Sequence, residues 1–432
     1  MTAGADPLGV RARRVLDIRS GRWLADAVVV VAGDRIEQVG GEPPAGVPVF
    51  DLGDRSLLPG LIDTHTHVLL QGNRTQAEYA DQILREEPAH RVARAVRAMG
   101  IGLEHGFTSM RDLGTEGAGY ADVALRDAVA EGVIPGPRMF VAGPAIGATG
   151  SYPLLGYRSD WAVPVGVAEC DGVEGCRREV RRQIARGVDW IKVYATQGRG
   201  VHLTDDGYME APPPWTAAEL QTIVDEAHAQ GVRVAAHASA VTGTEMAVAA
   251  GVDSIEHGFA IRPSTAQRMA ARGIALVPTL LVTRAIQRAR VAERGSLWER
   301  VPTMHHLSLR TCRNEGVPVV FGTDAGGFDW LEINQADELG ILVELGLSPL
   351  EAIRSATLGA AALLDRAGRL GEIAVGAAAD LVACPGDPLR DIAALTRVDT
   401  VVRAGAAVRM PPDASRPQPA TTPGSGGSTV PG

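Results

Sequence analysis

Six side chains of types that bind metal ions or transfer protons each stand at the end of a short hydrophobic run in this 432-residue chain. Each run has the length and the Val, Ile and Ala content of a buried β-strand. Nitrogen and oxygen ligands delivered from several strand ends indicate a metal-assisted hydrolase built on a barrel. The six residues are four histidines, a lysine and an aspartate: His65, His67, Lys192, His237, His257 and Asp324.

The histidines form two candidate pairs. His65 and His67 are separated by one residue, and residues i and i+2 of a strand point to the same face, so both can bind one metal ion. His237 and His257, at successive strand ends, would bind a second ion. The alternative for each histidine is a hydrogen-bonded place in the core. Asp63 would either orient these ligands or serve the fold alone.

Lys192 lies within Trp-Ile-Lys-Val, where burial disfavours the ammonium form. A neutral amine there can react with carbon dioxide and become a carbamate, which is an anionic oxygen ligand able to bridge two metal ions. The alternative is an ammonium that pairs with a carboxylate at the barrel mouth. Asp324 would bind the first metal ion and act as general base and acid, or else cap a helix after the last strand.

The segments between these residues alternate between helix and strand. Thr216 and Glu219 form a capping box that starts a helix, Gly231 ends that helix, and an apolar strand then reaches His237. The same order recurs through the central part of the chain and gives eight strands. Alternating helices and buried strands predict an α/β fold with a parallel sheet, and eight strands favour a (β/α)8 TIM barrel. Such barrels carry catalytic groups at the C-terminal ends of their strands.

Both ends of the chain carry strand-like patterns outside the barrel. A hairpin pattern occupies residues 27–39, and strand-like apolar segments return after residue 380. We therefore expect the two ends to pair into one small β-sandwich domain. The final segment is rich in Pro, Ser, Thr and Gly and lacks aromatic residues, which predicts disorder. The predicted boundaries are 1–58 and 367–410 for the β domain, 59–366 for the barrel, and 411–432 for the disordered tail.

Composition excludes several classes of protein. Hydrophobic residues make up 45% of the chain and charged residues 22%, as in ordinary globular proteins, and a formal charge of −9 spread along the chain argues against a nucleic-acid partner. No 18-residue apolar run and no signal-peptide pattern occur, so we predict a cytoplasmic protein that acts on a small molecule without a membrane partner. A homo-oligomer is compatible with this composition. Cys170 and Cys176 are expected to be reduced, with a local disulfide as the alternative.

Seven short motifs follow one another between residues 10 and 410: LPGLIDTHTH from Leu58, GFTSMRDLG from Gly106, DWIKVY from Asp189, AAHA from Ala235, GVDSIEHG from Gly251, GTDA from Gly322 and GAAADLV from Gly376. Together they resemble the amidohydrolase superfamily, and within it the imidazolonepropionase-like and prolidase-type branch. The resemblance implies a TIM barrel that holds two divalent metal ions, usually zinc.

The resemblance also implies roles for the six residues. The pair His65 and His67 would bind the buried ion, and the other histidine pair the more exposed one. A carbamate on Lys192 would bridge the two ions, and Asp324 would shuttle protons. Two such ions acidify a bridging water to hydroxide, which attacks the substrate.

The predicted function is hydrolysis of a C–N amide bond in a peptide-like, N-acyl amino acid or cyclic amide substrate by this hydroxide. Ester, lactone or phosphotriester hydrolysis on the same site is the alternative. A barrel that only binds its ligand is disfavoured because all six ligand-type residues occur together. Tyr194, two residues beyond Lys192 on the same strand face, would donate a hydrogen bond to the developing oxyanion or to a substrate carboxylate, or else pack in the core.

Residues of the substrate pocket are sought in the loops that follow the strands. Where many dipeptide-cleaving relatives carry Gly-Gly-His, this chain reads Thr-Gly-Ser-Tyr at residues 149–152, which argues against peptidase activity. An amide substrate with an apolar or aromatic part, and with a carboxylate held by Arg199, is expected instead. Side chains in such loops also often face solvent. The candidate pocket residues are Tyr152, Arg199, His202 and Trp215.

Overall fold

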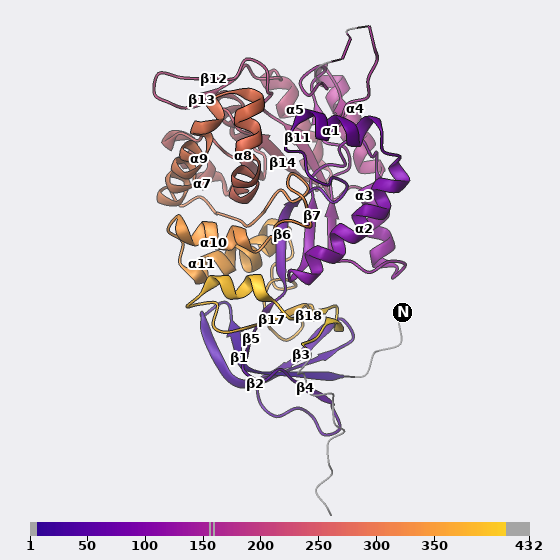
Figure 1. The fold of residues 1–432 in the computed structure, drawn as a ribbon, viewed down its shortest axis with the longest axis vertical. Coiled ribbons are helices and arrows are strands. Elements are labelled where there is room, and N and C mark those ends of the chain that lie inside the picture. The colour runs from indigo at the N-terminus through magenta and orange to yellow at the C-terminus, as the bar shows by residue number, and fades with distance from the viewer. Residues whose placement is uncertain (1–6, 155–156, 159, 412–432) are drawn as a thin grey trace, which may run out of the picture.

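A computed structural model describes residues 7–154, 157–158 and 160–411 of the chain. It has two parts, a barrel wrapped by helices and a sheet domain that lies below the barrel in Figure 1. This arrangement confirms the predicted α/β fold, a TIM barrel with a β domain built from both chain ends. The predicted tail lies outside the described residues from position 412 onward.

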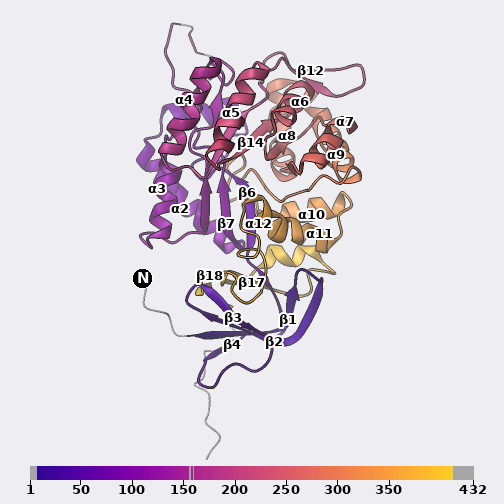
Figure 2. The ribbon, with the colours of Figure 1, turned by 180° about the vertical axis from the view of Figure 1, so that it is seen from behind.

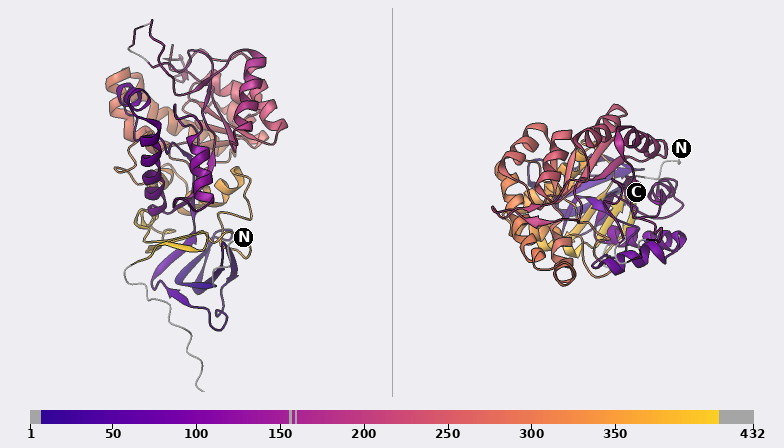
Figure 3. Two further views of the ribbon diagram at one scale, coloured as in Figure 1. Left: turned by 90° about the vertical axis from the view of Figure 1, so that its right-hand side faces the viewer. Right: turned by 90° about the horizontal axis from the view of Figure 1, so that it is seen from above.

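Eight parallel extended segments of the described residues form the barrel, which Figure 3 (right) shows from above. Neighbours in the ring follow chain order, and the ring closes where Leu276 bridges Val319 and Thr66 bridges Ala325. The segments are β6 (Leu61–Thr66), β7 (Phe107–Asp112), β8 (Arg138–Val141), β11 (Trp190–Tyr194), β14 (Arg233–Ala238), β15 (Ser254–His257), β16 (Ala275–Val277) and the extended stretch 318–325.

Strand register brings the ends of the barrel strands to one level. β6 begins just after Pro59 ends a strand of the sheet domain, so the C-terminal end of β6 points away from that domain (Figure 1). In the parallel register Tyr194 lies opposite His237, and Ala238 lies opposite His257. The polar residues that end these strands therefore gather at the end of the barrel that is remote from the sheet domain.

Helices cover the outside of the barrel (Figure 2). Thr216 and Glu219 form the predicted capping box at the start of α5, and Gly231, with φ 72°, follows its end as predicted. The helices are α1 (Gln76–Leu84), α2 (Pro88–Glu104), α3 (Ala121–Ala130), α4 (Gly172–Ala185), α5 (Ala217–Ala229), α6 (Val241–Ala250), α7 (Pro263–Arg272), α8 (Leu280–Arg294), α9 (Leu297–Asn314), α10 (Asp337–Glu344), α11 (Pro349–Arg354), the π-helix η1 (Ser355–Gly359) and α12 (Ala360–Leu363).

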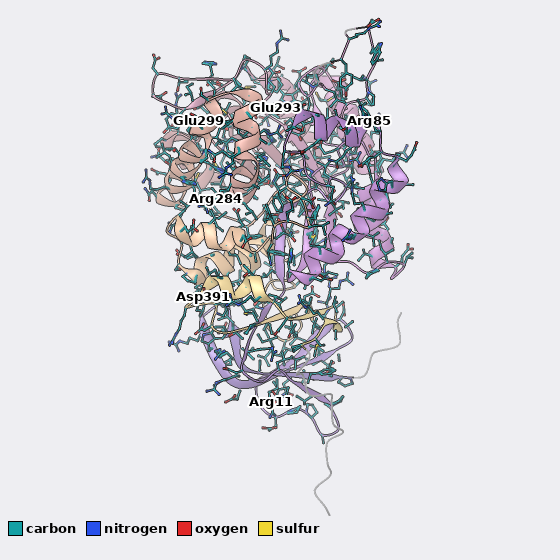
Figure 4. The ribbon with its side chains drawn as sticks, viewed as in Figure 1. Arg11, Arg85, Arg284, Glu293, Glu299 and Asp391 are labelled. Atoms are coloured by element: carbon teal, nitrogen blue, oxygen red, sulfur yellow. The ribbon has the colours of Figure 1, made fainter. Side chains whose placement is uncertain are left out.

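Several segments at the C-terminal ends of the strands extend the barrel. The backbone N–H of Gln76 in α1 donates to the Glu293 carboxylate of α8 at 2.6 Å, which ties α1 to the barrel; Glu293 is labelled in Figure 4. The short strands β9 and β10 add to the sheet beside β11, and β12 pairs antiparallel with β13 as a small hairpin. Their bounds are β9 (Ile146–Gly147), β10 (Ala168–Glu169), β12 (His202–Leu203) and β13 (Met209–Glu210).

The sheet domain joins the two ends of the chain, as the sequence predicts. β17 runs antiparallel to β5 from the pair Leu381 and Pro59 to the pair Pro385 and Arg55. The predicted hairpin is formed by β2 and β3. The eight strands of this sheet are β1 (Leu8–Asp17), β2 (Arg22–Ala32), β3 (Arg35–Val39), β4 (Val49–Asp51), β5 (Arg55–Pro59), β17 (Leu381–Pro385), β18 (Thr400–Arg403) and β19 (Ala406–Arg409), and the 3-10 helix η2 (Ile392–Arg397) precedes β18.

The cysteines of the described residues are buried and free. Cys170 lies just before α4 and Cys176 lies within its first turns, with 3.5 Å between their Sγ atoms. The pair is therefore reduced here, in agreement with the sequence-based expectation.

We expect Thr216→Ala to lower the free energy of unfolding by about 1 kcal/mol, because the first turn of α5 loses the side-chain acceptor of its capping box. Urea unfolding followed by circular dichroism measures this loss. Thr222→Ala on the same helix is the control, since the Thr222 hydroxyl only donates to the carbonyl of Ala218 and alanine is the better helix former. Equal losses for both variants would contradict the assignment.

Candidate metal centre

Three predicted ligands converge at the end of β6. The ligand atoms of His65, His67 and Asp324 all lie within 4.8 Å of one another. Oδ1 of Asp324 is 3.3 Å from Nε2 of His67 and 3.6 Å from Nε2 of His65. Neutral imidazole nitrogens and a carboxylate oxygen are suitable donors for a divalent ion such as zinc.

The second histidine pair continues this cluster. Ring centroids lie 5.4 Å apart for His65 and His67, 5.0 Å for His65 and His257, and 4.7 Å for His257 and His237. The four imidazoles therefore form one row across the ends of β6, β14 and β15. Such a row offers several nitrogen donors of the kind that bind divalent ions.

Hydrogen bonds orient three of the four rings. Nδ1 of His65 lies 2.7 Å from the Glu256 carboxylate, and Nδ1 of His67 lies 2.8 Å from the Gly114 carbonyl. Because both partners accept, each Nδ1 carries the hydrogen and each Nε2 keeps its lone pair. Nδ1 of His257 lies 2.7 Å from the Thr279 hydroxyl.

Burial disfavours the charged forms of His65, His237 and His257. It lowers the pKa of His65 and His257 well below the usual value and the pKa of His237 to about 3. Burial also raises the pKa of Asp324 to about 6. Neutral imidazole is the form that binds a metal ion, so the desolvated cluster is prepared for ligation.

Lys192 lies among these ligands, on β11. Its side chain is 1% exposed, and its Nζ atom has no hydrogen-bond partner among the described residues. Burial lowers the pKa of Lys192 to about 8. Within the described residues no carboxylate is paired with this amine, so no hydrogen bond offsets the cost of its burial.

Lys192 is also the single lysine among the 42 lysine and arginine residues of the chain. All of the other residues in this count are arginines. An arginine keeps its proton at all physiological pH values, whereas a buried lysine can become a neutral amine. The one lysine of the chain thus stands where its amine, unlike a guanidinium, can become neutral.

The backbone at the ligands departs from ordinary strand geometry. His257 and Asp324 have φ values of 67° and 59°, in the left-handed region that non-glycine residues seldom adopt. Gly326 is required beside them, since a Cβ atom there would lie 2.2 Å from the carbonyl oxygen of His67. Backbone strain of this kind is typical of functional sites.

Two residues that support the site were missed by the sequence analysis. Glu256 is fully buried; one of its oxygens contacts His65, and the other accepts a hydrogen bond from Arg111 at 2.9 Å. The Arg111 guanidinium also lies 4.3 Å from the centre of the Trp190 ring. Both residues are charged side chains inside strand-like runs, which is the same signal that identified Lys192. Their roles were missed because their partners come from distant segments of the chain.

Asp63 links the first and last barrel strands. Its carboxylate accepts hydrogen bonds from the Thr323 hydroxyl at 2.6 Å, from the Gln335 amide at 2.7 Å and from the backbone N–H of His65 at 3.1 Å. Burial raises the pKa of Asp63 to about 6. Asp63 therefore fixes the backbone that carries His65 and Asp324. Among the described residues its carboxylate makes no hydrogen bond to a side chain of the ligand cluster.

The predicted pocket residues divide into two groups. Tyr194 and Tyr152 lie beside the centre: the Tyr194 ring is 4.9 Å from the His237 ring and 4.5 Å from the Tyr152 ring. Trp215 is buried, and its indole N–H donates to the Tyr194 carbonyl at 2.7 Å, so it supports the strand. Arg199 and His202 are exposed and make no contact with the cluster in the described residues.

A parallel barrel that carries this set of nitrogen and oxygen donors on its strand ends is the architecture of a metal-dependent hydrolase. The model of the amidohydrolase family matches residues 56–408, which is most of the chain. The chain belongs to the amidohydrolase family and is a hydrolase that acts on C–N bonds.

Three relatives illustrate this membership. Ochratoxinase from Aspergillus niger is 32% identical over 403 residues, which cover 86% of this chain and 80% of that protein. Imidazolonepropionase from Deinococcus radiodurans is 26% identical over 396 residues, covering 86% and 88% of the two chains. The crystal structure of a prolidase complexed with N-methylphosphonate-L-proline superposes with a TM-score of 0.82 at 32% identity, over 94% of this chain and all of that one.

None of the helices in the described residues is both long and apolar enough to cross a membrane.

We expect Glu256→Gln to weaken metal binding by about tenfold to a hundredfold, because His65 loses the charged partner that orients it. Competition with a chromogenic chelator measures the affinity. Glu344→Gln is the control, since Glu344 pairs with Arg284 on the surface at 2.6 Å. Unchanged affinity in the Glu256 variant, with the fold intact, would show that this contact does not tune the centre.

Proposed function

We propose that the chain is a binuclear metal-dependent hydrolase that cleaves C–N amide bonds. In this proposal His65, His67 and Asp324 hold one ion, His237 and His257 hold the other, and a carbamate on Lys192 bridges them. The observation that carries the proposal is the buried amine of the chain's single lysine, which has no hydrogen-bond partner among the described residues and interacts electrostatically with His65, His237, His257 and Asp324. Zinc is the favoured metal because most donors are imidazole nitrogens.

When bound, the metal ions supply an acidified water and polarise the carbonyl of the substrate. Asp324 accepts a proton at its carboxylate and returns it to the leaving nitrogen, as a general base and acid at the edge of the centre. The Nε2 lone pairs of His65 and His67 stay available because their Nδ1 hydrogens are held elsewhere.

The names of the relatives support an amide substrate. A prolidase and an imidazolonepropionase are hydrolases of C–N bonds, and both align with most of the chain. We infer a small-molecule substrate that enters beside Tyr194 and Tyr152, where the structure places aromatic rings next to the centre. Peptide-like, N-acyl amino acid and cyclic amides are the classes to assay first.

Protein purified with zinc is expected to contain about two ions per chain, as binuclear hydrolytic sites do. Lys192→Ala should lose both metal and activity, and propionate at high concentration should restore part of each by replacing the carbamate. Lys192→Arg keeps a basic side chain but cannot be carboxylated, so it should fail in the same way. Elemental analysis gives the stoichiometry, and one ion or none in the wild-type protein would contradict the binuclear centre.

The carbamate itself is open to direct observation, because the chain has a single lysine. Metal-loaded protein exchanged into ¹³C-bicarbonate should show one carbamate carbon resonance, which Lys192→Ala should lack. A fully metallated protein without this resonance would contradict the bridge.

The reaction class is tested by parallel assays of amide, ester, lactone and phosphotriester substrates on the metal-loaded protein. We expect the highest kcat/KM among the amides and complete loss of turnover in Asp324→Asn, which cannot accept the proton. Faster turnover of a lactone or a phosphotriester than of any amide would require the alternative function.

A further inference from the structure

A buried carboxylate lies beside the metal centre without being one of its proposed ligands. Glu116 follows β7 and is 2% exposed. Its Oε1 accepts a hydrogen bond from the Tyr194 hydroxyl at 3.0 Å, and its Oε2 accepts one from the Tyr79 hydroxyl. No Lys, Arg or His side chain of the described residues forms an ion pair with it. Glu116 is therefore a buried carboxylate without a direct ion pair; Arg91 and Lys192 act on it through longer-range charge interactions only.

Three tyrosine rings surround this acid and come from three separate segments. Tyr79 lies on α1, Tyr152 follows β9, and Tyr194 ends β11. The rings of Tyr79 and Tyr152 lie 5.8 Å apart at 88°, and those of Tyr152 and Tyr194 lie 4.5 Å apart. We call Glu116 and these three residues the tyrosine–carboxylate cluster.

The chain leaves room for the carboxylate. A Cβ atom on Gly166 would lie 1.8 Å from the Tyr79 hydroxyl and 2.7 Å from Oε2 of Glu116. A Cβ atom on Gly114 would lie 3.4 Å from Oε1 of Glu116 and 3.3 Å from the His67 ring, so the acid lies next to a metal ligand. The two glycines thus allow Glu116 to reach the edge of the centre.

A neighbouring arginine fixes the backbone and leaves the carboxylate unpaired. The guanidinium of Arg91 donates to the carbonyl oxygens of Glu116 and Thr115 at 2.8 and 2.9 Å. Glu116 itself has φ 48°, a left-handed conformation that these bonds help to hold. These hydrogen bonds therefore fix the backbone from which the Glu116 side chain extends.

A carboxylate has about four acceptor positions, and two are used here. A buried acid without a cation is costly, while the faces of aromatic rings attract cations. We propose that the tyrosine–carboxylate cluster binds a protonated amine of the substrate while the scissile amide lies at the metal centre. This inference rests on the proposed function and names its substrate class, amides that carry a cationic amino group. It differs from the sequence-based expectation of a substrate carboxylate held by Arg199, which is exposed.

Binding of small probes to the metal-loaded protein tests the subsite without any turnover. We expect n-butylammonium to bind more tightly than its neutral counterpart pentan-1-ol in saturation-transfer NMR titrations. Glu116→Gln should weaken n-butylammonium binding by about tenfold or more, as loss of a charge-assisted hydrogen bond implies, and should leave pentan-1-ol unaffected. Glu344→Gln is the control for charge remote from the site, and Glu116→Asp, which keeps the charge, should retain part of the preference. An unchanged ratio in Glu116→Gln would overturn the proposal.

Substrate pairs test the same subsite in catalysis. For an aminoacyl p-nitroanilide and its N-acetyl derivative, Glu116→Gln should lower kcat/KM about tenfold or more for the free amine and by less than about twofold for the acetylated form. Equal losses for both substrates, or loss of bound metal, would show that Glu116 serves the centre itself and would overturn the proposal. If the wild-type protein hydrolyses no amide, the proposed function fails, and the probe titrations still decide whether the subsite exists.

Discussion

The cost of burying ionisable side chains without water is the constraint on which this structure depends. The barrel interior holds four imidazoles, an amine and several carboxylates within a few contacts of one another. Hydrogen bonds to Glu256 and to the Gly114 carbonyl orient two of the rings. The amine of Lys192 is left without such a partner among the described residues, so the cost of its burial is not offset by a hydrogen bond.

The two ends of the barrel have different roles, one structural and one functional. At the end next to the sheet domain, β5 and β17 join the two ends of the chain into one sheet, and Leu58 and Val382 of these strands share one apolar cluster with barrel residues such as Phe107. At the opposite end, the strand ends carry the ligands, and Asp63 binds the first strand to the last through Thr323. This division between a stabilising and a functional end is general for TIM barrels.

Sequence patterns predicted the barrel, the β domain and the capping box of α5, because periodicity and glycine positions are local signals. The six ligand-type residues were recognisable because each is a polar residue that ends an apolar run. Glu116 was not recognisable, since its tyrosine partners come from three segments that only the fold brings together. Arg199 and His202 were selected from a loop without periodicity. In such a loop the residue type does not show whether a side chain points to the site or to solvent, and the structure places both at the surface.

The scarcity of lysine has a consequence for proteolysis. A protease that cleaves only after lysine has one target bond in the whole chain, the one between Lys192 and Val193. Both residues lie in a fully buried barrel strand, so the bond is reached only when the barrel opens. Cleavage into two fragments would then report global unfolding, and its rate would follow the opening of the strand that carries Lys192.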